Sequence, residues 1–348
     1  FSLIQPRHFA IFDMQHKSIL ITFSCWLLTY LLTAQSVDGI SSGEVKQLLK
    51  KLNILGSVLY VAAHPDDENT RLIAYFANEK LFNTAYLSAT RGDGGQNLIG
   101  PEIRENLGLI RTHELLAARR TDGGTQFFSR ANDFGYSKNP DETLSIWDKE
   151  KVLEDFVRVI RTVKPDVIIT RFNTISGITH GHHTTSALLA LEAFDLAGDS
   201  SVYPDQLRTL EVWQPKKLFW NASSWFYSNN QIKFNPEGLY SINVGTYNPY
   251  LGVSYTEMAA RSRSMHKSQG FGSIGSRGDE LEYLELLRGD STENDVFGGI
   301  DTTWERVEQS QKIAQFLSDA QEAYEVELSL IHISEPTRRY AISYAVFC

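Results

Sequence analysis

The chain has 348 residues, of which 42% are hydrophobic and 22% are charged, so it can form a sizeable core and is not mainly disordered. Its 33 Lys and Arg residues are outnumbered by 42 Asp and Glu residues. The resulting net charge of −9 argues against a nucleic-acid partner or an anionic membrane surface.

The N-terminal segment has the pattern of a secretory signal peptide. Residues 14–34 begin with Met14, carry a positive charge at Lys17 and continue into an apolar run over 19–32. This run is too short for a comfortable bilayer span, so we expect cleavage after residue 34 and no stable membrane span. The alternative is an uncleaved membrane anchor. Residues 1–13 are interpreted as translated upstream sequence, and the protein is expected to be secreted or periplasmic.

The central part of the chain alternates apolar, strand-like runs with amphipathic, helix-like segments. This alternation predicts a Rossmann-like, mainly parallel sheet flanked by helices, in a single α/β domain over residues 35–275. Ligands of such sheets bind beyond the carboxyl ends of the strands. The expected strands are Ser57–Ala63, Thr84–Thr90, Thr125–Ser129, Asp166–Thr170 and Lys217–Trp220, and the expected helices are Gly43–Leu52, Asn69–Glu79, Ile103–Arg120, Lys149–Thr162 and Thr184–Leu196.

The C-terminal part is expected to add a helical extension over residues 276–327, with a helix at 301–327, that is cut short. Residues 328–348 resemble the translation of a sequencing adapter and its primer. The two cysteines, Cys25 and Cys348, lie in the two end segments. Disulfide and cysteine-nucleophile chemistry is therefore not expected in residues 35–327.

Two clusters of polar residues follow expected strands. The first is the His-Pro-Asp-Asp-Glu run His64–Glu68, and the second is the His-Gly-His-His run His180–His183. The adjacent like charges of Asp66 and Asp67 favour a nearby cation, and imidazole and carboxylate ligands together suit zinc. A surface histidine cluster is the alternative for the second motif. The location of both motifs beyond strand ends favours a shared site.

These motifs resemble those of the PIG-L/LmbE-like family of zinc-dependent N-deacetylases. The resemblance rests on Ala63–Glu68 and on His180 to His183, and it continues through Thr90–Gly95, Arg111–Ala118, Lys164–Ile169 and His266–Gln269. It covers roughly residues 55–270. It implies an enzyme with one zinc ion per chain that removes acetyl groups from substrates containing N-acetylglucosamine.

The resemblance implies that His64, Asp67 and His183 are the zinc ligands. Three protein ligands leave a position for water, as a catalytic zinc site requires, and zinc lowers the pKa of such a water to roughly 7. Asp66 is implied as the general base. It is not expected to share the metal with Asp67, because adjacent side chains diverge.

Two further side chains receive roles from the resemblance. His180 is the candidate for the general acid that protonates the departing amine, and for a donor to the oxyanion. Arg111 resembles the family's substrate-binding arginine. The alternative for Arg111 is a helix-surface arginine that is paired with Glu114.

The sequence departs from the family pattern at two positions. His182 occupies a position where the family often has an aspartate, which adjusts the neighbouring histidines through contacts outside the set of metal ligands. Ile178 stands where some members have a tyrosine that assists the oxyanion. These departures leave the source of transition-state stabilisation and the native substrate open.

We therefore expect a zinc-dependent hydrolase that removes the N-acetyl group from an N-acetylated sugar or glycoconjugate. One alternative keeps the zinc site and changes the substrate to a non-sugar amide. The other, motivated by His182 and Ile178, is a non-catalytic carbohydrate-binding protein with a degenerate site.

Overall fold

The computed structural model describes residues 40–223, 226–227, 233–293 and 295–324. The predicted signal peptide, the upstream and adapter-like segments and both cysteines lie outside these residues. The elements below all belong to the second of two units, which begins at Ser42. In the part of the chain that is described, no helix is both long and apolar enough to cross a membrane.

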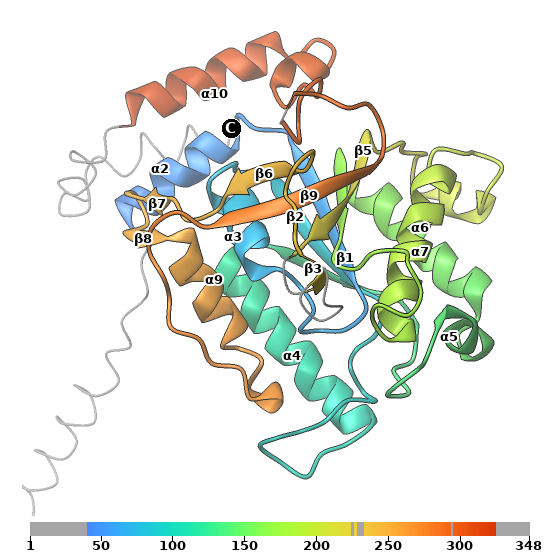
Figure 1. The fold of residues 1–348 in the computed structure, drawn as a ribbon. Coiled ribbons are helices and arrows are strands. Elements are labelled where there is room, and N and C mark those ends of the chain that lie inside the picture. The colour runs from blue at the N-terminus through green and yellow to red at the C-terminus, as the bar shows by residue number, and fades with distance from the viewer. Residues whose placement is uncertain (1–39, 224–225, 228–232, 294, 325–348) are drawn as a thin grey trace, which may run out of the picture. The chain divides into compact units, whose positions relative to one another are not determined.

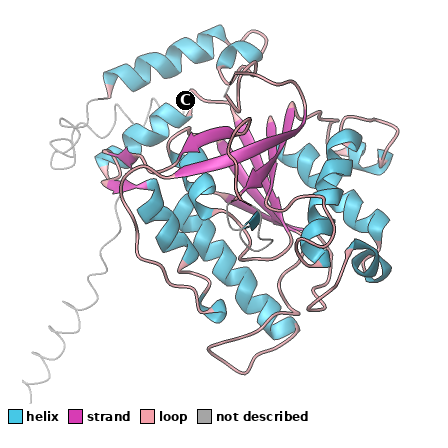
Figure 2. Ribbon diagram, in the orientation of Figure 1, coloured by secondary structure: helices cyan, strands magenta, loops and turns pink. Residues whose placement is uncertain are grey.

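A seven-stranded sheet forms the centre of the second unit (Figures 1 and 2). Its strands are β1 (Ser57–Ala62), β2 (Asn83–Ser88), β3 (Thr125–Phe128), β4 (Val167–Thr170), β5 (Lys217–Ala222), β6 (Tyr240–Asn243) and β9 (Leu281–Arg288), in the order β3-β2-β1-β4-β5-β9-β6. β1 to β5 run parallel, whereas β9 is antiparallel to both β5 and β6. A separate small sheet pairs β7 (Tyr247–Asn248) with β8 (Val253–Ser254).

Helices cover both faces of the sheet, as its buried parallel strands require. The helices are α2 (Ser42–Lys51), α3 (Thr70–Asn78), α4 (Glu105–Asp122), α5 (Pro140–Ile146), α6 (Lys149–Val163), α7 (Gly181–Leu196), α9 (Tyr255–Arg263) and α10 (Gln311–Ala323), with 3-10 turns at Pro204–Arg208, Lys267–Gln269 and Trp304–Arg306. In Figure 1, α3, α4 and α9 lie on one side of the sheet, and α5, α6 and α7 lie on the other.

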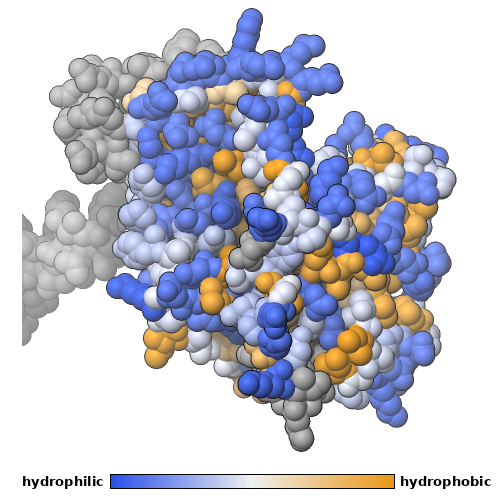
Figure 3. All heavy atoms as spheres, turned by 45° about the horizontal axis from the view of Figure 1, so that its top comes forward, coloured by the Kyte–Doolittle hydropathy of each residue, from blue (hydrophilic) through white to orange (hydrophobic). Residues whose placement is uncertain are grey.

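β1 separates two hydrophobic cores, because alternate residues of a strand point to opposite faces. Tyr60 packs with Phe76 of α3 in one core, whereas Leu59 packs with Phe156 of α6 in the other. All six residues of β1 are buried, as its continuous apolar run predicts. On the face that Figure 3 shows, hydrophilic side chains predominate and hydrophobic ones occur in small groups.

The order of the strands reverses beside β1. The chain runs outward through β2 and β3 and then returns to place β4 and β5 on the other side of β1. Such a reversal opens a crevice at the carboxyl ends of the central strands, where α/β proteins bind ligands. The segment after β1 contains His64–Glu68, and the segment after β4 leads to His180–His183. The topology thus brings the two motifs to one edge of the sheet.

The predicted α/β fold is confirmed, but the expected helical extension over 276–327 differs from the structure. Within it, β9 lies inside the sheet between β5 and β6, so this segment completes the central layer. Where a helix over 301–327 is expected, only α10 and the turn at Trp304–Arg306 are helical among the residues that the structure describes, which end at residue 324. The extension is therefore mixed in structure and partly built into the domain.

Candidate active site

The segment after β1 is held in place by side chains that hydrogen-bond to its backbone. The Tyr86 hydroxyl of β2 donates a hydrogen bond to the backbone oxygen of His64 (2.5 Å), and the Thr90 hydroxyl donates to the backbone oxygen of Ala63 (3.0 Å). The backbone N–H of His64 donates to Oδ2 of Asp67 (2.8 Å). These contacts fix the orientation of the His64 and Asp67 side chains before any ligand binds.

Two glycines allow the elements around the site to approach each other closely. A Cβ atom at Gly181, the first residue of α7, would collide with the backbone oxygen of Asn139. A Cβ atom at Gly92 would collide with the guanidinium of Arg111, and Gly92 also has a φ of +71°, which favours glycine. The glycine-rich loop after β2 therefore makes room for a buried arginine.

α7 presents the histidines of the second motif from its first turn. His180 is the N-cap of the helix, and His182 and His183 lie inside it, so the helix begins before the expected Thr184. The ring centroids of the three histidines lie 5.1 to 5.3 Å from that of His64. The start of α7 thus gathers four imidazoles at the carboxyl edge of the sheet.

Asp67 joins the two motifs. Its Oδ2 lies 3.0 Å from Nδ1 of His64, and its Oδ1 lies 3.5 Å from Nε2 of His183. Burial opposes ionisation of this carboxyl, but the charges and hydrogen bonds of His183 and His64 outweigh burial and hold the pKa of Asp67 well below its ordinary value. The three residues implied as zinc ligands therefore lie in contact, around an ionised carboxylate.

Asp133, which sequence analysis did not identify, lies on the other side of His64. Its carboxylate is 3.9 Å from Nε2 of His64 and 3.8 Å from Nδ1 of the buried His182. Among the described residues, two trios of ligand atoms lie within 4.8 Å of one another: His64, His180 and His183, and His64, Asp133 and His182. His64 belongs to both trios, so a metal ion bound in either place would contact it.

The donor set fits a zinc ion. Nδ1 of His180 and Nε2 of His182 are buried and have no hydrogen-bond partner within the described ranges. Burial and the neighbouring histidines lower the pKa of both rings to about 3, so both are neutral at pH 7. Burial lowers the pKa of His64, but the negative charge of Asp67 outweighs burial and raises that pKa. Zinc prefers neutral imidazole nitrogens beside an ionised carboxylate, which His180 and His182 supply as they stand and which His64 supplies once it is deprotonated.

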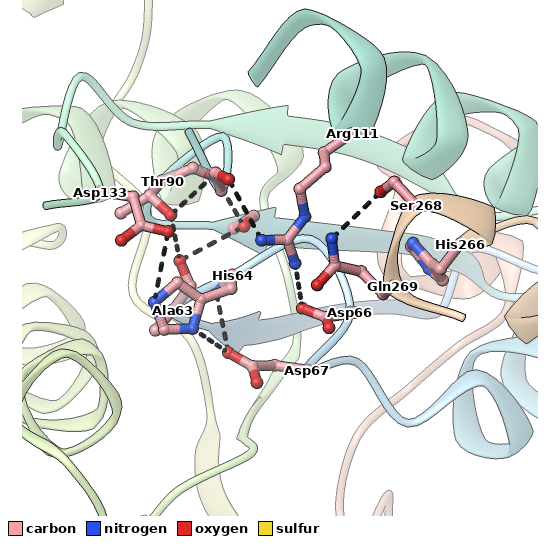
Figure 4. Close-up of polar contacts among 12 residues, drawn as sticks. Ala63, His64, Asp66, Asp67, Thr90, Arg111, Asp133, His266, Ser268 and Gln269 are labelled. Atoms are coloured by element: carbon pink, nitrogen blue, oxygen red, sulfur yellow. Dashed lines mark hydrogen bonds and ion pairs between the residues drawn. The ribbon is translucent and has the colours of Figure 1, made fainter. Parts of the chain in front are cut away.

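Asp66 points toward Arg111 of α4 (Figure 4). An ion pair joins Nη2 of Arg111 to Oδ1 of Asp66, and Nη1 of Arg111 donates to the backbone oxygen of Gly92 (3.2 Å). The Arg111 side chain is only 4% exposed, and Glu114 accepts a hydrogen bond from Ser268 instead. The alternative of a helix-surface arginine paired with Glu114 is therefore wrong, and Arg111 orients Asp66.

Glu68, the last residue of the first motif, points away from these groups into the protein. Its fully buried carboxylate contacts Nη2 of Arg119 (3.2 Å) and Nε2 of His266 (2.7 Å). Burial disfavours the negative charge of Glu68, but the interactions with His266 and Arg119 outweigh burial and lower the pKa of Glu68. Contacts of Glu68 with α4 and with the segment that follows α9 thus hold the first motif in place.

The site residues line a cavity of about 440 Å³. Tyr136, which the sequence did not single out, lies in its lining with its ring 5.7 Å from that of His180. Gln269, from the His266–Gln269 motif, also lines the cavity. Ile178 is partly buried against the hydrophobic core and is not part of the lining. A cavity of this size suits a small polar ligand.

Comparison with known proteins gives the same family as the motifs. Residues 59–194 match PIG-L, described as GlcNAc-PI de-N-acetylase. The 1D-myo-inositol 2-acetamido-2-deoxy-alpha-D-glucopyranoside deacetylase of Streptomyces scabiei is 29% identical over 183 residues, which cover 47% of this chain and 55% of that protein. The mycothiol S-conjugate amidase of Streptomyces coelicolor is 27% identical over 179 residues, which cover 47% of this chain and 60% of that protein. The chain thus spans little more than half the length of these relatives.

Among solved structures, the N,N'-diacetylchitobiose deacetylase from Pyrococcus horikoshii has a TM-score of 0.44 at 16% identity, and the alignment covers 61% of this chain and 70% of that one. The segment matched to PIG-L contains both motifs, Arg111 and Asp133. Over residues 59–194, the chain therefore carries a match to the PIG-L family.

Proposed function

We propose that this protein is a zinc-dependent hydrolase that removes the N-acetyl group from an N-acetylated sugar or glycoconjugate. The observation that carries the proposal is the arrangement of the two motifs. Asp67 bridges His64 and His183, whereas the neighbouring Asp66 stays outside this cluster and faces the same cavity. A ligand set and a separate carboxylate base are the two parts that a metal-assisted amide hydrolysis needs.

His64, Asp67 and His183 are the residues that would hold the zinc ion. When bound in such a site, zinc lowers the pKa of a water molecule to roughly 7 and polarises a carbonyl oxygen. The names of the two relatives support amide chemistry, since one is a deacetylase of an acetamido sugar and the other is an amidase.

Asp66 is the proposed general base. Arg111 binds its Oδ1, which leaves Oδ2 to accept a proton from water in the cavity. The ion pair also holds the carboxylate in one orientation, and such positioning contributes to the efficiency of proton transfer. Arg111 is therefore proposed to act in part by positioning Asp66, besides the substrate binding that the resemblance implies for it.

His180 is the proposed proton donor to the departing amine. Its low pKa, together with the partial positive charge at the start of α7, keeps the ring neutral in the free site. His180 must therefore first receive a proton, and the proton that Asp66 removes from water is the available one. The exposed ring of Tyr136 at the same cavity is suited to pack against a face of the sugar.

The proposal is tested by measuring acetate release with added zinc from a panel of N-acetylated sugars and N-acetylated amino acids. We expect release from the sugars and its loss after chelation. Release from the amino-acid amides alone would favour the second candidate, a hydrolase of non-sugar amides, which the amidase relative supports. Bound zinc without turnover of any amide would favour the non-catalytic alternative.

Export is part of the same proposal, with the signal peptide at residues 14–34. N-terminal sequencing of the protein recovered from the medium or periplasm is expected to begin at Gln35. An intact N-terminus in the membrane fraction would instead support the uncleaved anchor.

A further inference from the structure

A second cavity, of about 310 Å³, adjoins the loop that carries the proposed base. Its lining includes Glu68 at the end of the first motif, Arg71 of α3, Arg171 directly after β4 and Arg263 at the end of α9. None of these four residues lines the cavity of the proposed active site. The two cavities are linked through the loop, because Nη1 of Arg263 donates a hydrogen bond to the backbone oxygen of Asp66 (3.3 Å).

The carboxylates near the second cavity already have cationic partners. Arg71 forms ion pairs with Glu280 and Glu282, and Glu282 is the only one of these two that lines the cavity. Glu68, the other carboxylate in the lining, is paired with Arg119, which lies outside the cavity. The negative charges of the lining are therefore balanced without Arg171 and Arg263.

Arg171 and Arg263 form no ion pair with any carboxylate in the described part of the chain. Arg171 donates to Oδ1 of Asn221 at 3.4 Å, and the hydrogen bond of Arg263 goes to a backbone oxygen. Each guanidinium lies over an aromatic ring, 5.4 Å from the centroid of Phe226 for Arg171 and 4.0 Å from that of Phe271 for Arg263. The rings hold the two cations in place while leaving donors available.

The start of α3 adds to the positive potential of the same cavity. Asn69 and Thr70 are in its lining, and Asn69 is the N-cap of the helix. A helix N-terminus carries a partial positive charge. Two guanidiniums without a carboxylate partner lie in the same cavity, although the whole chain has a net charge of −9. Like charges brought together in a partly buried cavity favour a bound counterion.

We propose that this cavity is an anion-binding site, in which Arg171 and Arg263 hold a phosphate or carboxylate group. Guanidinium groups recognise both anions through paired N–H donors, and the cavity is large enough for one such group together with part of a larger molecule. Because Arg263 also binds the backbone of Asp66, the anion would stabilise the loop that carries the proposed base. The anion is either free or an acidic group of the substrate.

The site is tested by titrating the purified full chain with inorganic phosphate at low ionic strength in a calorimeter. We expect one bound phosphate per chain, and at least tenfold weaker binding in Arg171→Gln and in Arg263→Gln. Arg208→Gln is the matched control, because Arg208 is exposed, is paired with Asp205 and does not line this cavity. Circular dichroism and thermal melting verify that each variant is folded.

Phosphate bound to a metal in the active-site cavity would be insensitive to these arginine variants. Equal binding by wild type and both variants, or no binding by wild type, would therefore overturn the proposal. Arg171→Lys keeps the charge but loses the paired donors, and we expect it to bind phosphate more weakly than wild type and more tightly than Arg171→Gln.

The source of the anion is resolved by comparing acetate release from N-acetylglucosamine and from N-acetylglucosamine 1-phosphate. If the anion belongs to the substrate, the phosphorylated sugar has a KM at least tenfold lower, and Arg171→Gln removes the difference. If the anion is free, the two KM values agree while phosphate binding persists. The comparison of KM values rests on the proposed function, whereas the phosphate titration does not. If the protein hydrolyses neither sugar, the titration alone still tests the anion-binding site.

Discussion

At the scale of single residues, the central question is which carboxylate shares the metal with His64. Asp67 contacts His64 and His183 from one side, and Asp133 approaches His64 and His182 from the other. Asp67 makes the shorter contacts, and its charge is held by two histidines. We therefore propose Asp67 as the ligand and Asp133 as the group that orients His64 from behind, although Asp133 is the carboxylate whose oxygen lies within 4.8 Å of ligand atoms of His64 and His182.

Replacement of the two carboxylates distinguishes these roles. We expect Asp67→Ala to reduce the zinc content of the purified protein to near zero. Asp133→Asn should keep close to one zinc per chain, because the amide retains the shape of the side chain and the ligands remain. Elemental analysis after dialysis measures both. Loss of zinc in Asp133→Asn with retention in Asp67→Ala would assign the site to His64, Asp133 and His182.

The two motifs could be predicted because each gathers several chemically active side chains in a short run, one close behind β1 and the other at the end of the loop that follows β4. Asp133 follows β3 in the same way, but a lone aspartate in a polar loop looks like a turn residue. Asp133, and with it Tyr136, could have been proposed by applying the strand-end rule to every strand. The ion pair between Arg111 and Asp66 joins residues far apart in the chain, so no local pattern indicates it.

At the scale of elements, α4 supports the site with a charged face that points inward. Arg111, Arg119 and Asp122 are buried in this helix together with apolar residues such as Leu107 and Leu115. Arg119 lies between Asp122 (2.6 Å) and Glu68 (3.2 Å), and Asp122 also accepts a hydrogen bond from Ser262 of α9. The helix thus connects the first motif to α9 through buried charges.

Removing the central cation of this network should destabilise the fold. In Arg119→Ala, the buried carboxylates Glu68 and Asp122 lose a shared partner, and we expect a loss of about 3 kcal/mol in the free energy of unfolding. The exposed neighbour Arg120→Ala should change it by less than about 0.5 kcal/mol. Urea unfolding of the three proteins measures the difference. Similar values for both variants would show that the network does not support the fold.

A continuous apolar run predicted β1, and a clear helical period predicted α6. β9 and α9 were not predicted because their sequences lack such runs. In β9, the apolar residues are interrupted by Glu282 and Glu285, and the strand is stabilised by pairing with β5 and β6, which precede it by many residues. Its position depends on tertiary contacts rather than on local preference.

At the scale of the whole molecule, the C-terminal part is tied into the centre of the domain. Arg306 binds the fully buried Asp166 through two contacts, Nη1 to Oδ2 (3.0 Å) and Nη2 to Oδ1 (2.8 Å). Asp166 precedes β4 and also accepts a hydrogen bond from the backbone N–H of Ser57 in β1 (3.0 Å). Together with β9, this contact makes residues 276–306 part of the folded core.

A truncation tests this conclusion against the domain boundary predicted at residue 275. We expect a protein that ends there to lack a cooperative unfolding transition, since it loses β9 from between β5 and β6 and leaves Asp166 buried without its cation. Thermal melting followed by circular dichroism measures this against the full chain. A truncated protein that melts cooperatively near the temperature of the full chain would restore the predicted boundary.

The proposed hydrolysis depends on Asp66 acting as a base beside, and not within, the metal site. The most direct test is acetate release by Asp66→Asn from the best N-acetylated sugar of the panel, measured together with zinc content. We predict that the variant keeps its zinc and that kcat falls at least about 100-fold, as expected when general-base catalysis is removed. A variant that retains both its zinc and full activity would contradict the account.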